Sequence, residues 1–361
     1  MSNRPFNFAA GPSTIPDAIL EKAKSELLSW NGSGVSPMEV GHRTPEFTAL
    51  INNLQDSIKK MLNVPDNYKV LFMHGGAQGQ FAFAPMNLLG SKTSADYINT
   101  GTWSNKAVKE AGLYCDVNVA ATLTEGDLLS VPAQNAWNLS DDAAFVYYCS
   151  NETINGVEFN WTPQTGDVPL VCDMTSSIAS RPIDVASHGV IFAGAQKNLG
   201  IAGLAIVIVR DDLLDSAITN TPRIFRYKDQ AAQSSLLNTP PTYACYMTSL
   251  FCEWVEEQGG VEALEKINIE KAKLLYDAID SSDFYRNPID PAYRSRMNVT
   301  FNLPNEDMEK HFFEDAKNRG LISLKGHRSV GGVRASIYNA MPLEGVKALA
   351  DFMREFEKER G

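Results

Sequence analysis

The sequence lacks any apolar run long enough to cross a membrane, and its start, Met1 to Phe6, lacks the apolar core of a signal peptide. We therefore expect a cytoplasmic protein with no membrane partner. The sequence also lacks an excess of basic residues, because its formal net charge at pH 7 is −11. A nucleic-acid partner is disfavoured, since proteins that bind nucleic acids carry a basic surface. Anionic small molecules would have to be attracted by a local basic pocket.

Cysteine is scarce as well, with five residues, and none of them form a C-x-x-C pair. The five are Cys115, Cys149, Cys172, Cys245 and Cys252. An odd number without metal-ligand spacing fits reduced thiols and no structural metal. The G-x-G-x-x-G and Walker patterns are absent too, which disfavours a nicotinamide dehydrogenase or a nucleoside triphosphatase.

No low-complexity linker or internal repeat divides the chain, but its patterns change near Gln258-Gly259-Gly260. From about residue 17 to 257, helical patterns alternate with short apolar runs, which is typical of a mostly parallel sheet covered by helices. These runs lie near Val70–Met73, Ala95–Asn99, Ala144–Cys149, Leu170–Cys172, Val190–Ala193 and Ala205–Val209. Beyond the break the patterns predict a smaller α/β domain. Its expected elements are helices over Val261–Asp280 and Asn305–Asn318, strands near Met297–Phe301, Leu321–Leu324 and Gly332–Ile337, and a terminal helix from Pro342.

One lysine, Lys197, follows a predicted buried strand and precedes a glycine turn at Gly200. Burial at such a connection disfavours the ammonium form and lowers the pKa of the lysine, which gives the free amine that Schiff-base formation requires. The plain alternative is a solvated lysine that merely leaves a strand. Asp173 ends another predicted strand, 24 positions earlier, and suits a partner for a protonated pyridine nitrogen. Asp173 could equally be a helix N-cap or turn residue.

A third segment, Val70 to Phe81, runs from an apolar strand through Gly75 and Gly76 into an amphipathic stretch. Backbone N–H groups at a helix start favour a phosphate, and glycine lets the backbone approach it closely. The turn alone is a weak signal. Together with Asp173 and Lys197 it supplies phosphate, ring and aldehyde contacts for one cofactor, pyridoxal phosphate.

With these residues in place, the sequence resembles the phosphoserine aminotransferases, a pyridoxal-phosphate family of fold type I and class V. The resemblance spans essentially the whole chain. It is carried by Asn7 to Ser13, Gly41-His42-Arg43, Gly75-Gly76-Ala77, Trp103, Asn151-Glu152-Thr153, Asp173, Gly194 to Asn198, Asn238 to Thr242, Gly326-His327-Arg328 and Val333 to Ser336. It implies a large domain over residues 17–257 with a mostly parallel sheet of seven strands. It also implies a small α/β domain built from residues 1–16 and 258–361.

The resemblance also implies a role for each residue around the cofactor. Lys197 forms the Schiff base, Asp173 pairs with the pyridine nitrogen, Trp103 stacks on the ring, and Thr153 lies near the ring hydroxyl. The phosphate is held by Ala77, Gln78 and Gln196, and from the partner subunit of a homodimer by Asn238 and Thr239. Core filling by Trp103 and a plain loop hydroxyl at Thr153 are the alternatives.

For the substrates, glutamate and O-phosphoserine, the resemblance implies a set of cations. Arg334 resembles the clamp for the α-carboxylate, which an arginine binds bidentately. The resemblance implies that the substrate phosphate or side-chain carboxylate is bound by His42, Arg43, His327 and Arg328. It also implies that Ser13 contacts the substrate. Taken singly, any arginine here could be a surface ion-pair residue. One departure concerns Gln78, because some family members carry an arginine there, and glutamine adds no charge for the substrate phosphate.

The expected activity is a ping-pong transamination between glutamate and 3-phosphohydroxypyruvate, in serine biosynthesis, and a phosphorylated substrate of vitamin B6 synthesis stays open. A cysteine desulfurase of the same fold would need a mobile reactive cysteine after Lys197. Cys245 and Cys252 instead lie seven apart in a helical pattern and are expected to face a core. A non-catalytic relative could have lost Lys197 or Asp173, and both are present.

Overall fold

Seven strands form the central sheet of the computed structural model, which describes residues 4–126 and 128–361. In spatial order they are β2 (Tyr68–Met73), β10 (Ala205–Arg210), β9 (Val190–Gly194), β8 (Leu170–Asp173), β5 (Val146–Cys149), β3 (Ser94–Asn99) and β4 (Asp116–Thr122). Neighbouring strands pair in parallel except at β10, which is antiparallel to both β2 and β9. The expected mostly parallel sheet is therefore confirmed.

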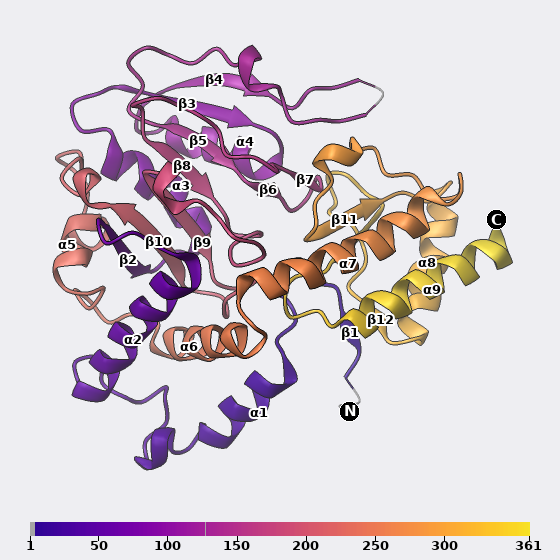
Figure 1. The fold of residues 1–361 in the computed structure, drawn as a ribbon, viewed down its shortest axis with the longest axis horizontal. Coiled ribbons are helices and arrows are strands. Elements are labelled where there is room, and N and C mark those ends of the chain that lie inside the picture. Colours follow the sequence, from indigo (N-terminus) through magenta and orange to yellow (C-terminus); the bar gives the residue numbers. More distant parts are fainter. Residues whose placement is uncertain (1–3, 127) are drawn as a thin grey trace.

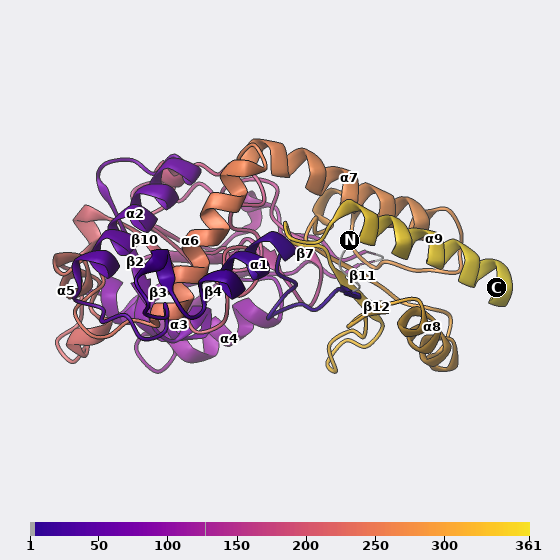
Figure 2. The same ribbon diagram turned by 90° about the horizontal axis from the view of Figure 1, so that it is seen from below.

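Alternating side chains of the strands point to opposite faces, so each face receives its own layer of helices. On one face Val70 and Phe72 join a core with α2 (Pro45–Leu62) and α6 (Thr242–Glu257). On the other face, side chains such as Leu71 join a core with three helices. These are α3 (Gly76–Leu88), α4 (Thr102–Ala111) and α5 (Tyr227–Ala232). Figures 1 and 2 show this arrangement, and in Figure 2 helices α2 and α6 lie on one side of the strands and α3 and α4 on the other. Cys245 and Cys252 are buried in the first core, as expected.

The C-terminal elements gather at the other end of the molecule (Figures 1 and 2). They are α7 (Val261–Asp280), β11 (Asn298–Phe301), α8 (Glu306–Asn318), β12 (Leu321–Ile322), β13 (Val333–Ser336) and α9 (Leu343–Arg360). Strand β11 pairs antiparallel with β13, while β12 pairs in parallel with the N-terminal strand β1 (Phe6–Asn7). Residues 6 and 7 therefore lie with the C-terminal elements. The domain bounds 1–16, 17–257 and 258–361 stay a prediction.

The remaining elements connect these parts. They are α1 (Asp17–Glu26), the hairpin of β6 (Asn151–Glu152) and β7 (Val157–Glu158), and 3₁₀ turns at Trp30–Gly32, Gln134–Ala136, Val185–Ser187, Asp211–Leu213, Arg223–Phe225 and Pro291–Tyr293. The sequence pattern did not predict β4, an edge strand whose one buried residue is Ala120. Within the described ranges, no helix combines the length and apolar character that a membrane crossing needs.

Candidate active site

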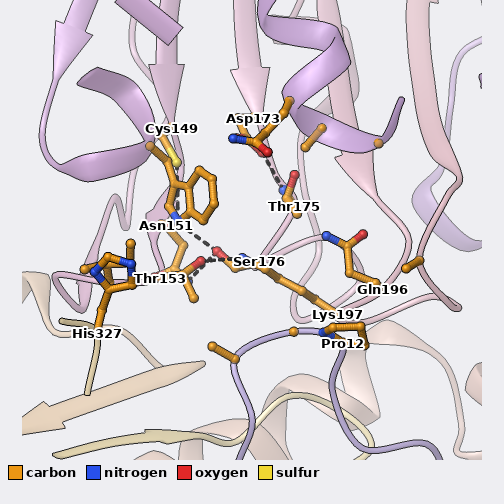
Figure 3. Close-up of a pocket in the computed structure, with 18 of the residues that line it drawn as sticks. Pro12, Cys149, Asn151, Thr153, Asp173, Thr175, Ser176, Gln196, Lys197 and His327 are labelled. Carbon is orange, nitrogen blue, oxygen red and sulfur yellow. Dashed lines mark hydrogen bonds between the residues drawn. The ribbon is translucent and has the colours of Figure 1, made fainter. Parts of the chain in front are cut away.

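A cavity of about 470 Å³ lies where β5 and β8 end, at Cys149 and Asp173. The carboxyl ends of parallel strands meet at one edge of a sheet, which is where ligands bind in such folds. The cavity is also lined by the turn between β2 and α3, by the β6 strand region and by the connection between β9 and β10. Ala10 to Pro12 from the N-terminal segment, with His327 and Arg334, complete it. Figure 3 shows these side chains converging from several strands and loops.

Lys197 lies in this cavity, buried, in the connection that turns β9 back into β10. Its Nζ donates a hydrogen bond of 2.5 Å to Thr153 Oγ1, and it lies 5.5 Å from the centroid of the Trp103 ring. Figure 3 shows the lysine extended toward Thr153. Burial lowers the pKa of Lys197 to about 8, and the negative charge of Asp173 opposes this shift.

The backbone around Lys197 is fixed by the segment before α1. Ser13 Oγ donates to the carbonyl oxygen of Lys197 at 2.6 Å, and the Ser13 amide donates to the Gln196 carbonyl oxygen. Gly11 passes so close that a Cβ at this position would lie 3.3 Å from Lys197 Cγ. Ser13 therefore touches the lysine backbone, and it does not line the cavity of this chain.

Asp173 is buried at the end of β8, and its Oδ1 accepts from the Thr175 amide at 2.8 Å. Burial raises the pKa of this carboxyl, while the hydrogen bonds from Thr175 and the charge of Lys197 oppose the shift. The cavity thus combines a buried acid and a buried amine that stabilise each other's charged forms.

The start of α3 supplies a different kind of contact. Gly75 and Gly76 both have positive φ, at 89° and 57°, a region that glycine enters without strain. No side chain caps the first turn of α3, and no acidic residue occurs in it. Its N–H groups and the positive end of the helix dipole are therefore available to an anion beside Ala77 and Gln78. The Gln196 side chain lines the same cavity.

Two basic side chains, Arg334 and His327, border the cavity on the side of the C-terminal elements. Arg334, on β13, has a buried Nε without a hydrogen-bond partner among the described residues, and burial lowers the pKa of its guanidinium. His327 accepts from Ser329 Oγ through Nδ1 at 2.7 Å, when the hydroxyl is taken as the donor. Slight burial lowers the pKa of His327, and the charges of Arg334, Arg328 and Lys106 lower it further.

Besides Ser13, five more of the expected residues lie away from the cavity lining in this chain: His42, Arg43, Asn238, Thr239 and Arg328. The Nε2 atom of His42 is buried without a hydrogen-bond partner among the described residues. The carbonyl oxygen of Thr239 pairs with His74 Nε2 at 2.9 Å, so the Asn238-Thr239 segment passes the turn before α3.

Sequence reasoning missed several residues at the site, among them Cys149, Ser176, Lys106 and Glu152. Cys149 is the last residue of a predicted strand, so the strand-end argument that found Asp173 could have found it. The Nζ of Lys106 lies 4.3 Å from the centroid of the Trp103 ring, one helical turn onward, a spacing readable from the sequence.

A family model described as "Aminotransferase class-V" matches residues 5–349 of the chain. The phosphoserine aminotransferase of Pseudomonas paraeruginosa is 55% identical over 361 residues, which cover 100% of both chains. A solved phosphoserine aminotransferase from Bacillus circulans subsp. alkalophilus is 44% identical, with a TM-score of 0.95 and full coverage of both chains. The pyridoxal-phosphate-bound phosphoserine aminotransferase from Trichomonas vaginalis is 41% identical, with a TM-score of 0.93 over 97% of this chain and 100% of that one.

Proposed function

The chain belongs to the class-V aminotransferase family, and we propose that it transfers an amino group between glutamate and 3-phosphohydroxypyruvate, giving 2-oxoglutarate and O-phosphoserine. The observation that carries this proposal is the buried Lys197 in one cavity with Asp173, beneath a cationic rim. A free amine, a buried acid and cations are what transamination of a doubly charged substrate requires.

The residues present fit pyridoxal phosphate. The uncapped start of α3 suits its phosphate, Asp173 suits its ring nitrogen, Trp103 offers a stacking surface, and Lys197 suits its aldehyde. When bound, this cofactor supplies an electron sink for bond changes at the substrate's α-carbon. Gln196, with Asn238 and Thr239 of a partner subunit, would complete the phosphate contacts.

The protein's own groups then divide the work. Lys197, with its pKa lowered to about 8, can accept and return a proton at neutral pH, and Thr153 Oγ1 holds its Nζ in place. Asp173 would stabilise the protonated form of a bound cofactor's ring nitrogen. The unpartnered Nε of Arg334 suits the α-carboxylate that both amino-acid substrates carry. His327, with Arg328, His42 and Arg43, would bind the phosphate or the side-chain carboxylate, and Ser13 would border the same substrate.

We propose a homodimer with shared sites, in which the partner subunit supplies Asn238 and Thr239, and also His42 and Arg43. The connection between α1 and α2 that carries His42 and Arg43 also exposes Leu28 and Met38, whose exposed fractions are 82% and 55%. Exposed apolar side chains next to expected substrate cations support an interface at this connection. All five cysteines are unpaired, which supports the reducing cytoplasm as the location.

The test follows the visible absorption of the purified protein loaded with pyridoxal phosphate. We expect a band that bleaches when glutamate is added and returns when 3-phosphohydroxypyruvate is added. Lys197→Ala is the control, because it keeps the cavity and removes the amine. Absence of bleaching by glutamate would refute the proposal, and equal recovery with unphosphorylated hydroxypyruvate would refute recognition of the phosphate.

A further inference from the structure

Glu152 is a fully buried carboxylate that faces the first turn of α4. Its Oε2 accepts from the Trp103 amide at 2.9 Å. Its Oε1 accepts from the Ser104 amide at 2.8 Å and from Ser104 Oγ at 2.6 Å. Glu152 is the residue directly before Thr153, whose hydroxyl holds Lys197 Nζ. Two adjacent residues therefore contact two parts of the site: the Thr153 hydroxyl contacts Lys197, and the Glu152 carboxylate contacts the backbone of Trp103.

The start of α4 is built to receive this carboxylate. Its N-cap residue is Gly101, which has no side chain to cap the helix. A Cβ at Gly101 would lie 2.6 Å from Glu152 Cδ, so glycine is required there by space. An anion is favoured at a helix N-terminus, where backbone N–H groups have no partner within the helix.

Three donors face the two oxygens of Glu152: the Trp103 amide, the Ser104 amide and the Ser104 hydroxyl. A carboxylate can accept from all three. A carboxamide in its place would turn its NH₂ group toward one of these donors. Burial raises the pKa of Glu152, while the hydrogen bonds from Ser104 and Trp103 oppose the shift. No ion pair balances its charge within the described residues. Burying a charge without an ion-pair partner costs free energy, and an apolar side chain could fill the same space without that cost.

We propose that Glu152 is a positioning residue that fixes the start of α4 and thereby holds the Trp103 ring in place for the cofactor. This rests on the proposed function for the cofactor's identity. The anchoring of α4 does not, because every contact involved lies within the chain.

The first experiment measures amide hydrogen exchange of peptides covering residues 100–106, in the cofactor-free and the loaded protein. In Glu152→Gln we expect exchange about tenfold or more faster, the size that follows from losing a hydrogen bond to a charged group. The matched control is Glu158→Gln. Glu158 is also buried and lies on β7, the strand paired with β6, but its side chain contacts Arg181 and Arg296 and not α4. It should leave exchange over 100–106 unchanged.

The second experiment measures the dissociation constant of pyridoxal phosphate and the circular dichroism of the bound cofactor. Glu152→Gln should weaken binding about tenfold and alter the dichroism band. In a Trp103→Phe background the same change should add little, because Glu152 acts through Trp103. If Glu152→Gln does not fold, Gly101→Ala displaces the carboxylate without removing it and should give the same two effects.

Unchanged exchange at the start of α4 would overturn the proposal, as would additive effects of Glu152→Gln and Trp103→Phe on cofactor binding. Fast exchange with unaltered cofactor affinity would also overturn it, since Glu152 would then be only a helix cap. If the wild-type protein bound no pyridoxal phosphate, the proposed function and the role toward the cofactor would both fail, while faster exchange would still support the anchoring of α4.

Discussion

Burial works against the charge of Lys197, because desolvation outweighs the attraction of Asp173 and leaves a pKa of about 8. The neutral amine therefore dominates only above that pH. In the cofactor-free protein we expect the rate of covalent attachment of pyridoxal phosphate to Lys197 to rise as the pH increases through about 8. Stopped-flow absorbance measures this rate.

Asp173→Asn is the control for this pH dependence. It removes the charge that raises the pKa of Lys197, so the midpoint should move to lower pH. A midpoint near 10.5, the ordinary value for lysine, would show that Lys197 is solvated and contradict the buried geometry.

The two arginines expected to bind substrate give a second prediction. Arg334→Ala should raise the KM for glutamate and for O-phosphoserine alike, by about ten- to a hundredfold, because both carry an α-carboxylate. Arg328→Ala should penalise the phosphorylated substrate more. Steady-state kinetics with both substrates measures this, and Arg354→Ala, an exposed arginine paired with Asp351 on α9, is the control. Equal penalties for both substrates in both variants would refute the division of roles.

At this scale the sequence predicted some residues and could not predict others. That Asp173 and Lys197 meet in one cavity was predictable, because both lie at the ends of apolar strands, and strand ends of a parallel sheet share one edge. The role of Glu152 could not be predicted, because its partners include backbone N–H groups of Trp103 and Ser104, and such groups leave no signal in the sequence. His42 and Arg43 lie away from the cavity in this chain, and under the proposed dimer their place depends on a second chain, about which local sequence pattern says nothing.

Among the elements, strand existence was predictable and strand direction was not. Five apolar runs of the large segment form strands that all run in one direction. The sixth, Ala205–Val209, forms β10, which runs the opposite way because the connection at Lys197 is too short for a crossover helix. Strand β4 was missed because most of its side chains are partly or fully exposed at the sheet edge. The helix over Val261–Asp280 occurs as predicted.

Helix α7 carries a buried lysine that ties it to the turn between β13 and α9. Lys271 Nζ donates to the carbonyl oxygens of Ile337, Tyr338 and Met341, at 3.0, 2.7 and 3.1 Å. Burial lowers the pKa of Lys271 to about 7, and three acceptors match the three donors of an ammonium group. In the same turn, the backbone N–H of Asn339 donates to Asn198 Oδ1, and Asn198 directly follows Lys197. The turn therefore links α7 to the cavity.

Lys271→Met should lower the free energy of unfolding by about 2–5 kcal/mol, because it leaves three buried carbonyl oxygens without their donor. Denaturant unfolding measures the loss. Lys273→Met, on the exposed side of α7 in a pair with Asp277, is the matched control and should change stability by less than about 0.5 kcal/mol. Similar stabilities of the two variants would show that the carbonyl groups find other donors.

For the whole molecule, the proposed shared site predicts complementation between inactive parents. One parent carries Lys197→Ala, and the other carries Asn238→Ala with Thr239→Ala. In the mixed dimer, one site collects both lesions and the other none, so activity should reappear after joint reassembly. Mass measurement confirms that mixed dimers formed. Activity no higher than the mean of the parents would mean that each chain uses its own Asn238-Thr239 segment.

The pairing of β1 with β12 has a consequence for synthesis on the ribosome. Phe6 pairs with Leu321, so β1 has no strand partner until more than 300 further residues have emerged, up to Leu321 and Ile322. At roughly 5–20 residues per second, this wait is on the order of tens of seconds. Ser13, which holds the Lys197 backbone, lies in the same leading stretch. The strands of the large sheet end at Arg210 and can therefore pair during translation, while the segment that carries Ser13 is anchored only after residues 321 and 322 have emerged.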